Sequence, residues 1–455
     1  MPHYLFVTGK LAEPSLRRML AELGPRVGFE YTVAVLPITV AALATTPWIA
    51  THLTPAMQFD RVILPGLCNG ELHTLTQAWG PLSVAKGPAD LRDLPEYFGT
   101  QGKPESDYGM YDIEILAEIN HAPRLSLQEI LAKATTAHTD GADVIDLGCD
   151  PGTRWTAVAE VVTALRDAGL RVSLDTFDPW EAEHAAKAGA ELILSVNRTN
   201  RDACVDWGCE VVAVPDVPAD CQGLAETVEF LLTHNVRFRI DPVLEPIAFG
   251  FAASLGRYLD TRKKYPNTEL MMGVGNLTEL TDADSAGVNV MLLGFCQELG
   301  IRSVLTTEVI NWAQSSVREL DLARRLVYHA CNHQTLPKRM EPNLILLRDA
   351  KLREHGEETL RELAEQVRDS NFRIFAERGR LHVINRDMHL QGNDPFELFA
   401  EMQKHGVIDP AHAFYLGYEF AKAVTALTLG KNYVQDQALK WGFLTLPEKN
   451  GHASV

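Results

Sequence analysis

The sequence predicts an α/β protein built around a closed (β/α)8 TIM barrel of parallel strands. Between Ile113 and Thr307, a short apolar run ends eight times in a polar or glycine-rich turn. The runs recur roughly every 25–35 residues with helical stretches between them, which is the repeat of βα units. No Gly-x-Gly-x-x-Gly follows the first run, so an open, doubly wound sheet is the less favoured alternative.

Four segments of different character follow one another along the 455 residues. A chain of this length is expected to form two or three domains. We predict an N-terminal α/β domain, a linker rich in Gly, Pro and polar residues, the barrel, and a C-terminal α+β domain. In that order they comprise residues 1–97, 98–112, 113–336 and 337–455.

The N-terminal domain is predicted from apolar runs separated by a helical stretch. We expect strands at Tyr4–Thr8, Tyr31–Leu36 and Arg61–Pro65, and a helix over Leu11–Leu23. Gly9-Lys10 joins the first strand to this helix, where an anion could bind. A structural turn is favoured, because the segment is neither a P-loop nor a dinucleotide fingerprint.

The barrel units consist of apolar runs that end in Asp or Asn, each followed by a helical stretch. The clearest runs are Ile115–Asn120, Val144–Asp150, Val172–Thr176, Leu192–Asn197, Phe238–Asp241 and Met271–Asn276. Helices are predicted over Leu127–His138, Arg154–Ala168, Trp180–Ala188, Gly223–His234, Ala283–Leu299 and Val309–Val327.

The C-terminal domain combines a hairpin signal with helices. Phe372–Glu377 and Arg380–Asn385 flank Arg378-Gly379, a turn that favours antiparallel pairing. We also expect a strand at Leu344–Arg348 and helices over His355–Val367, Pro395–His405 and His412–Leu429.

Composition limits the classes of partner and compartment. The formal net charge of −18 argues against non-specific binding to nucleic acid or to an anionic membrane surface. No stretch approaches the ~20 apolar residues of a membrane span, and the first residues lack the features of a signal peptide. The seven cysteines have no zinc-ligand spacing, and their odd number suits a reducing compartment. A cytoplasmic protein without membrane or nucleic-acid partners is therefore expected.

The polar residues at the strand ends carry the functional signal. Asp175, Asn197, Asp241 and Asn276 are expected to point inward on one rim, because active sites of βα barrels lie at the C-terminal ends of the strands. A single Asp in this position, such as Asp150, is equally often only a helix cap. As a set, carboxylates and carboxamides can read the donor-rich edge of a flat heterocycle such as a pterin.

At these positions the chain resembles dihydropteroate synthase over roughly residues 113–335. Three segments carry the resemblance: Gly141–Gly148 followed by Thr153-Arg154, Ser173-Leu174-Asp175-Thr176, and Asp241-Pro242. They match the family patterns G-A-x-I-I-D-x-G…T-R, S-x-D-T and D-P. Asn120 with Pro123 is similar to the family's N-x-T-P, although Ala122 replaces the Thr.

The resemblance implies a role for each matching residue. Asp175, Asn197 and Asp241 would hold the pterin ring, together with Asp146 of the first motif. Asn120 would lie near the pyrophosphate and a Mg²⁺ ion. Thr153 and Arg154 would belong to a loop that closes over the substrate. Of these, Asp175, Asp241 and Arg154 would take part in catalysis.

Two strand ends depart from the synthase pattern. The family's S-R-K and R-x-H are replaced here by Gly275-Asn276-Leu277 and Thr306-Thr307-Glu308, which removes cations that would bind pyrophosphate. Asn276 instead resembles the ring-binding Asn of methyltetrahydrofolate-dependent methyltransferases. Arg198 and Arg201 could supply an anion site with Arg154, or simply be exposed loop residues.

The sequence is compatible with three functions. The arrangement of domains and the run Leu429–Asp436 resemble the dihydropteroate synthase-like proteins of organisms that make tetrahydromethanopterin. This resemblance implies a homodimeric transferase that joins a dihydropterin methyl pyrophosphate to an arylamine of the ribofuranosyl aminobenzene phosphate type. The alternative is a pterin-binding or methyl-transferring module without synthase activity. A barrel enzyme for phosphorylated sugars is a weaker third possibility, and the roles of His121 and Glu308 stay open.

Overall fold

A computed structural model describes residues 1–55, 58–100, 108–405 and 409–448. The chain divides into two compact units, one of Met1–Ala283 with Val288–Pro337 and one of Asp284–Gly287 with Lys338–Val455. Part of the predicted linker, residues 101–107, lies outside the described residues. No helix in the described ranges is long and apolar enough to cross a membrane.

The N-terminal domain is a four-stranded parallel sheet in the order β2-β1-β3-β4. The three predicted strands are present as β1 (His3–Thr8), β2 (Glu30–Val35) and β3 (Arg61–Leu64), and β4 (Val84–Lys86) adds a strand that was not predicted. Helix α1 (Glu13–Val27) contributes Leu16, Leu20 and Leu23 to a core with Phe6 and Phe29. The helices α2 (Thr46–His52), α3 (His73–Trp79) and α4 (Leu94–Tyr97) complete this domain.

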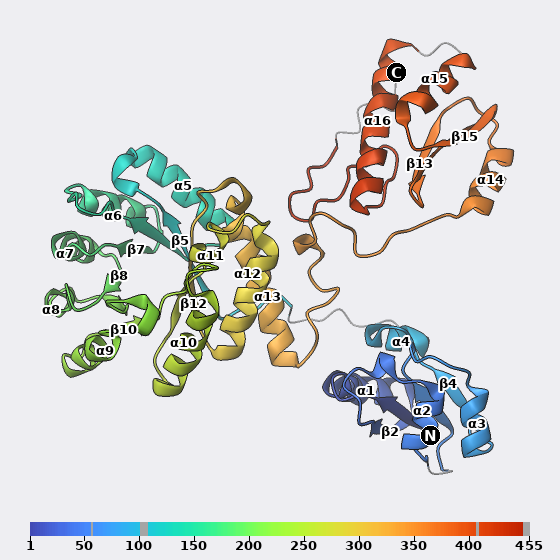
Figure 1. Ribbon diagram of the computed structural model, residues 1–455, viewed down its shortest axis with the longest axis horizontal. Helices are drawn as coiled ribbons and strands as arrows, with labels where there is room; N and C mark the ends of the chain where they lie inside the picture. The colour runs from blue at the N-terminus through green and yellow to red at the C-terminus, as the bar shows by residue number, and fades with distance from the viewer. Residues whose placement is uncertain (56–57, 101–107, 406–408, 449–455) are drawn as a thin grey trace. The chain divides into compact units, whose positions relative to one another are not determined.

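The predicted TIM barrel is confirmed (Figure 1). Eight parallel strands follow the order β10-β9-β8-β7-β6-β5-β12-β11, and a bridge between Ile240 and Leu270 joins the two end strands. The strands are β5 (Glu114–Ile119), β6 (Val144–Gly148), β7 (Val172–Asp175), β8 (Leu192–Val196), β9 (Glu210–Ala213), β10 (Phe238–Ile240), β11 (Met271–Gly273) and β12 (Ser303–Thr306).

The barrel helices lie outside the strands and bury one face each against them. Helix α6 (Val158–Asp167), for example, buries Val158, Val161, Val162 and Leu165. The others are α5 (Leu127–Asp140), α7 (Pro179–Ala188), α8 (Arg201–Cys204), α9 (Leu224–Thr233), α10 (Phe251–Lys264), α11 (Gly275–Thr278), α12 (Ser285–Leu299) and α13 (Ser316–His333).

Side chains fill the barrel in layers, as expected for a closed barrel of eight strands. The middle layer is an apolar cluster of Leu116, Val144, Leu192, Leu194, Val212 and Met271. Below it, at the N-terminal ends of the strands, Glu114 binds Arg171 at 2.6 Å and Arg239 at 2.7 Å. Above it, at the C-terminal ends, lies a layer of carboxyl groups.

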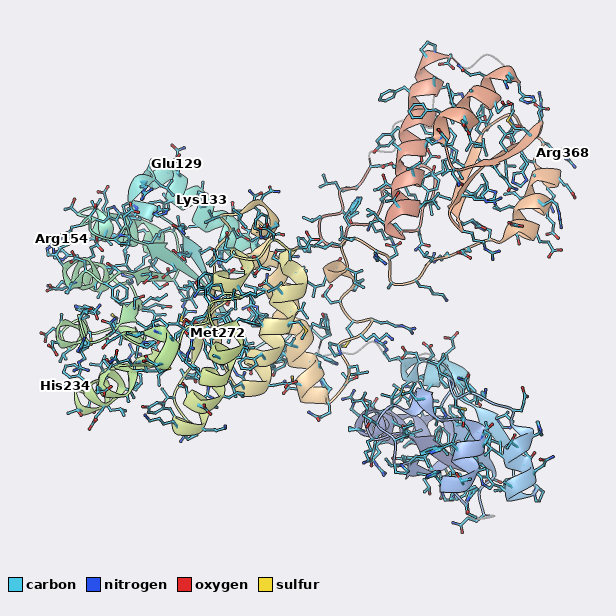
Figure 2. All side chains as sticks on the ribbon, viewed as in Figure 1. Glu129, Lys133, Arg154, His234, Met272 and Arg368 are labelled. Atoms are coloured by element: carbon cyan, nitrogen blue, oxygen red, sulfur yellow. The ribbon has the colours of Figure 1, made fainter. Side chains whose placement is uncertain are left out.

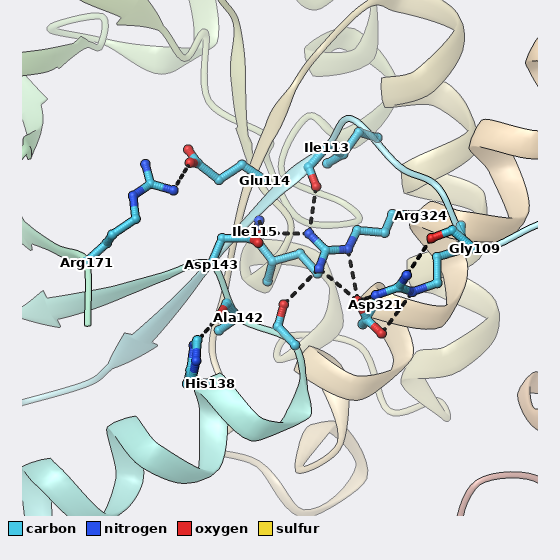
Figure 3. A network of polar contacts seen from close by, with 12 residues as sticks. Gly109, Ile113, Glu114, Ile115, His138, Ala142, Asp143, Arg171, Asp321 and Arg324 are labelled. Atoms are coloured by element: carbon cyan, nitrogen blue, oxygen red, sulfur yellow. Dashed lines mark hydrogen bonds and ion pairs between the residues drawn. The ribbon is translucent and has the colours of Figure 1, made fainter. Parts of the chain in front are cut away.

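A second ionic network closes the lower end of the barrel beside α5 and α13 (Figure 3). The guanidinium of Arg324 is 1% exposed, and it binds Asp321 at 2.8 Å and Asp143 at 2.5 Å. It also donates to the carbonyl oxygens of Ile113 and Gly141 at 2.9 and 3.0 Å. All of its hydrogen-bonding directions are therefore used within the protein.

The C-terminal domain contains the predicted hairpin in an antiparallel sheet of order β13-β14-β15. Strands β13 (Arg373–Glu377) and β14 (Arg380–Asn385) are the predicted pair, and β15 (Met388–Gly392) was not predicted. Helices α14 (Glu357–Gln366), α15 (Pro395–Lys404) and α16 (Pro410–Leu429) accompany the sheet. Leu416, Phe420 and Ala423 of α16 form its core with Ile374, Leu381 and Val383.

Two of the predicted elements are wrong. The segment Leu344–Arg348 is not a strand, because the carbonyl oxygen of Leu346 accepts a hydrogen bond from the Lys431 ammonium at 2.7 Å instead of a strand partner. The helix expected from Val309 begins only at Ser316. The carboxylate of Glu279 accepts the N–H groups of Val309 and Ile310, each at 2.9 Å, and holds the intervening segment as a loop.

The helix expected from Arg154 begins four residues later, at Val158. The backbone N–H of Trp155 donates to Glu181 at 2.6 Å, which fixes residues 151–157 as a loop above the barrel. This loop carries Thr153 and Arg154, so both are loop residues and neither is helical.

Candidate functional site

Strand register brings three carboxyl side chains together at the C-terminal end of the barrel. Glu118 of β5 is paired in register with Asp146 of β6, and Gly148 of β6 is paired with Asp175 of β7. Paired positions of neighbouring strands face the same side of a sheet, so these side chains point into the barrel. Asp241 follows β10, across the barrel from β6. The structure thus gathers the predicted Asp146, Asp175 and Asp241 on one rim.

Asp175 is held in place by a serine in an uncommon backbone conformation. Its Oδ1 accepts a hydrogen bond from the Ser195 hydroxyl at 2.6 Å. Ser195 has φ +69° and lies at a register shift between β8 and β9. Such a conformation is costly for a residue with a side chain and is found at functional sites. Burial raises the pKa of Asp175, and the hydrogen bond from Ser195 opposes that rise.

Asp146 lies deeper than Asp175 and is completely buried. Its Oδ1 accepts from the Ser173 hydroxyl at 2.6 Å, whereas Oδ2 has no hydrogen-bond partner among the described residues. Burial, and then the charges of Asp175 and Glu118, raise the pKa of Asp146 well above its usual value.

Asp241 is held by two hydrogen bonds to one of its oxygens. Its Oδ1 accepts from the Tyr258 hydroxyl at 2.5 Å and from the Val243 N–H at 2.8 Å. Burial raises the pKa of Asp241 to about 6, while these hydrogen bonds oppose the rise. A Cβ atom placed on Gly273 would lie 3.8 Å from Asp241 Oδ2 and 3.7 Å from Asn276 Nδ2, so both predicted ring-reading groups border this glycine. Asn276 donates to the Leu244 carbonyl oxygen at 2.9 Å.

Asn197 is buried, and its amide orientation is fixed. Its Oδ1 accepts from the N–H and the hydroxyl of Thr199 at 2.9 and 2.7 Å. This leaves the Nδ2 group to donate to a ligand. Asn200, whose side chain accepts from the Asn197 N–H at 3.0 Å, supports the turn and was not singled out from the sequence.

Glu118 is the main site residue that the sequence pattern did not reveal. It precedes the recognised Asn120 by two positions in an apolar run, where a single Glu gives no periodic signal. Burial, followed by the charges of Asp175 and Glu279, raises the pKa of Glu118 to about 7. The site therefore contains a fourth carboxyl group beside those predicted.

A cleft of ≈ 490 Å³ lies above Asp175. The predicted loop residues Thr153 and Arg154 line it, together with Phe177 and Asp178. Arg154 binds Asp178 at 2.9 Å and lies over the Trp180 ring, and Figure 2 shows it at the outer edge of the barrel. Its side chain is half exposed, so a phosphate could exchange for Asp178.

The three arginines predicted as one anion site do not converge. Arg198 is exposed and pairs with Asp216 at 3.3 Å. Arg201 donates to Thr227 and lies over the Phe230 ring, both on α9 outside the barrel. The Arg201 guanidinium thus packs against α9, and its phosphate contact stays a prediction.

The loop after β5 places Asn120 at the exposed end of the strand. His121 next to it has φ +52° and binds Asp150 at 2.5 Å, and Arg124 binds the same carboxylate at 2.8 Å. Asp150 therefore does not act as the cap of a helix. It connects the loops after β5 and β6.

Glu308 lies at the start of α13. It accepts the Val317 N–H at 2.9 Å at the start of α13, so it caps that helix. Burial raises the pKa of Glu308 to about 7. The neighbouring Thr307 donates to Glu279 at 2.9 Å. The end of β12 thus supplies acidic and hydroxyl groups where the synthase pattern has cations.

Three family descriptions match separate parts of the chain. Residues 119–218 match "Pterin binding enzyme", which includes Asn120, Asp146, Asp175 and Asn197. Residues 2–89 match a family of unknown function, DUF6513, and residues 365–436 match "PterinBD-DUF4346".

One relative spans the whole length. An uncharacterised protein of Methanocaldococcus jannaschii is 30% identical over 522 aligned residues, which cover 95% of this chain and 98% of that protein. Among solved structures, the dihydropteroate synthase of Burkholderia cenocepacia is 20% identical with a TM-score of 0.38, covering 48% of this chain and 91% of that one. The Thermus thermophilus dihydropteroate synthase is 22% identical with a TM-score of 0.38, covering 48% and 94%.

Proposed function

Because the chain belongs to the family of the Methanocaldococcus jannaschii protein, and its barrel is of the pterin-binding, dihydropteroate synthase-like type, we propose that it is a transferase of tetrahydromethanopterin biosynthesis. It would join a dihydropterin methyl pyrophosphate to an arylamine of the ribofuranosyl aminobenzene phosphate type and release pyrophosphate. The observation that carries this proposal is the position of Asp146, Asp175 and Asp241 at the C-terminal ends of the barrel strands, with the buried Asn197 after β8. It supports pterin binding through groups that accept or donate in fixed directions.

No protein nucleophile is required for this reaction. The amine nitrogen attacks the methylene carbon while the carbon–oxygen bond to pyrophosphate breaks, and the amine proton leaves to solvent. The protein would contribute by aligning the two substrates and by stabilising charge. Asp241, fixed by Tyr258 and Val243, would hold the amino and N–H edge of the ring. The charge that develops on the pterin would be stabilised by Asp175.

A Mg²⁺ ion would neutralise the departing pyrophosphate. Among the residues described, no three His, Cys, Asp or Glu side chains are grouped to hold a metal ion. This fits an ion bound mainly by substrate phosphates and water, with one or two protein oxygens. Asn120, at the exposed end of β5, would supply one such oxygen, and Thr153 and Arg154 would bind phosphate from the loop above.

A second candidate function is a pterin-binding or methyl-transferring module without synthase activity. It is favoured by Asn276, which borders Gly273 beside Asp241, and by the lack of cations at the ends of β11 and β12. This function predicts tight binding of a reduced pterin with no pyrophosphate released.

Pyrophosphate release separates the two functions. Purified full-length protein is mixed with dihydropterin methyl pyrophosphate, Mg²⁺ and either the ribosyl aminobenzene phosphate or p-aminobenzoate, and pyrophosphate is measured. We expect release that depends on the phosphorylated arylamine and is lost in Asp241→Asn with the circular dichroism spectrum unchanged. Pterin binding without release for any amine would favour the second function, and unchanged activity of Asp241→Asn would contradict the assigned site.

A further inference from the structure

The cleft above Asp175 lies between the chain segments that follow β6 and β7. Its lining comes from residues 149–154 after β6, from residues 175–178 at the end of β7 and from Glu181 of α7. Its volume of ≈ 490 Å³ is within the range of roughly 300–1,000 Å³ that small-molecule sites have. Of the described residues that are proposed to hold the pterin ring, only Asp175 lines it. The cleft is therefore a compartment beside the ring site, with room for a second ligand.

Phe177 is the exposed aromatic side chain of this cleft. It is 53% exposed and belongs to the cleft lining. Within the described ranges its ring makes no stacking, edge or cation–π contact, whereas the neighbouring Trp180 stacks on His184 with ring centroids 3.7 Å apart and lies under the Arg154 guanidinium. The protein thus uses the Trp180 ring for its own contacts and leaves the Phe177 ring available to a ligand.

The backbone on both sides of Phe177 is held by hydrogen bonds. The Thr176 hydroxyl donates to the buried Glu181 carboxylate and accepts the Asp178 N–H at 3.0 Å. The Asp178 carboxylate in turn accepts the Trp180 N–H at 2.7 Å and caps α7. A ring that binds against a side chain with an ordered backbone loses less conformational entropy than one that must first order a loop. Phe177 is therefore preorganised as a flat binding surface.

The charged lining residues of the cleft have other partners. Asp150 binds Arg124 at 2.8 Å, and Asp178 binds Arg154 at 2.9 Å. Arg154 is the lining residue to which phosphate is assigned above. Phe177 is the one aromatic residue among those that line the cleft. It is therefore the lining side chain that offers a flat apolar surface to a ring.

Resting on the transferase function proposed above, we propose that Phe177 stacks against the aromatic ring of the arylamine and thereby selects an aromatic amine as the second substrate. Stacked aromatic rings attract each other beyond the effect of the area they bury. The reaction requires the amine nitrogen next to the methylene carbon that the pterin carries. Because Asp175 belongs both to the ring site and to the cleft, a ring on Phe177 lies beside a pterin held by Asp175.

The test is the steady-state rate of pyrophosphate release by the full chain with dihydropterin methyl pyrophosphate, Mg²⁺ and either p-aminobenzoate or the ribosyl aminobenzene phosphate. For Phe177→Ala we expect the KM for each arylamine to rise about tenfold, with little change in kcat or in the KM for the pterin substrate. Phe177→Tyr keeps an aromatic ring and should retain the wild-type KM. Leu232→Ala is the matched control, because Leu232 is 59% exposed on α9 and does not line the cleft.

Failure of this inference and failure of the transferase function give different results. An unchanged arylamine KM in Phe177→Ala, or a higher KM for the pterin substrate instead, overturns the role of Phe177 while the transferase function stands. If the wild type releases no pyrophosphate with either amine, that function fails. Calorimetric titration with p-aminobenzoate, in the presence of 6-hydroxymethyl-7,8-dihydropterin and pyrophosphate, then decides the role of Phe177. Binding that weakens about tenfold in Phe177→Ala and is retained in Phe177→Tyr supports it, whereas no binding, or equal binding by the three proteins, overturns it.

Discussion

The carboxyl groups at the two ends of the barrel have different bonding partners. At the N-terminal ends of the strands, Glu114 binds Arg171 and Arg239, and Asp143 and Asp321 bind Arg324. At the C-terminal ends lie Glu118, Asp146, Asp175 and Asp241, and among the described residues no basic side chain is bound to them. The lower carboxyl groups are bound by arginines of the protein, whereas the upper ones are the groups to which the proposed function assigns the pterin.

The pKa values of the carboxyl groups also differ between the two ends. Although burial opposes its charged form, hydrogen bonds from Arg239 and Arg171 lower the pKa of Glu114. Four residues along the same strand, burial and neighbouring charges raise the pKa of Glu118 to about 7. Since both are glutamates of β5, the difference comes from their partners. Active sites of βα barrels lie at the C-terminal ends of the strands, which is the end where the pKa is raised here.

The largest effect is expected from removing the buried cation of the lower end. Arg324→Met should lower the free energy of unfolding by about 3–5 kcal/mol, because Asp143 and Asp321 lose their buried partner. Urea unfolding followed by fluorescence measures this. Arg318→Met on the same helix is the control. The Arg318 side chain is 42% exposed and lies 3.9 Å from Asp321, so its loss should change stability by less than about 1 kcal/mol. Equal losses of unfolding free energy in the two variants would contradict the special role of the buried Arg324.

A loss of activity without a loss of stability is expected at the upper end. Asp175→Asn should reduce turnover by about 10²–10³-fold, because a charge-stabilising group is removed from the site. Its melting temperature should be unchanged or higher, since a buried charge that no cation balances is also removed. Parallel assays of pyrophosphate release and thermal unfolding test this. A strongly destabilised Asp175→Asn protein would show that the upper carboxyl layer is structural.

Glu114 and Glu118 allow the sharpest comparison. The raised pKa of Glu118 favours its protonated form in the folded protein, so its contribution to stability is complete below about pH 4.5 and is lost as the pH rises through about 7. Glu118→Gln should therefore stabilise the ligand-free protein at pH 8, by up to about 3 kcal/mol. Glu114→Gln should destabilise it. Denaturant unfolding at pH 5 and pH 8 gives both values, and changes of the same sign would contradict the comparison.

The smallest effect is expected at the exposed loop above the site. Arg154→Gln should raise the KM for the pyrophosphate substrate by about tenfold with little change in stability, because its pair with Asp178 is exposed. Steady-state kinetics at saturating arylamine measure the change. Arg166→Gln, on α6 with its guanidinium bound to the Ala188 carbonyl oxygen, is the control. An unchanged KM would remove Arg154 from the phosphate site.

Much of the fold could be predicted because local patterns specify it. The eight apolar runs are the eight strands, and the hairpin around Arg378-Gly379 is present. The incorrectly predicted elements are those whose backbone conformation depends on side chains distant in the sequence. Lys431 occupies the Leu346 carbonyl that a strand would use, and Glu279 holds Val309 and Ile310 out of a helix. Neither contact has a signal in the neighbouring sequence.

The sequence by itself determined the barrel and the row of Asp and Asn at its strand ends, because period and turn chemistry are local properties. Tertiary structure alone decided which of these residues share a site. Register placed Glu118 beside Asp146 and Asp175, the conformation of Ser195 oriented Asp175, and packing against Phe230 placed Arg201 outside the barrel. The physical reason is that ionisation and ligand access depend on which groups approach in space. Arg239 and Glu114, for example, are 125 positions apart and meet only when the barrel closes.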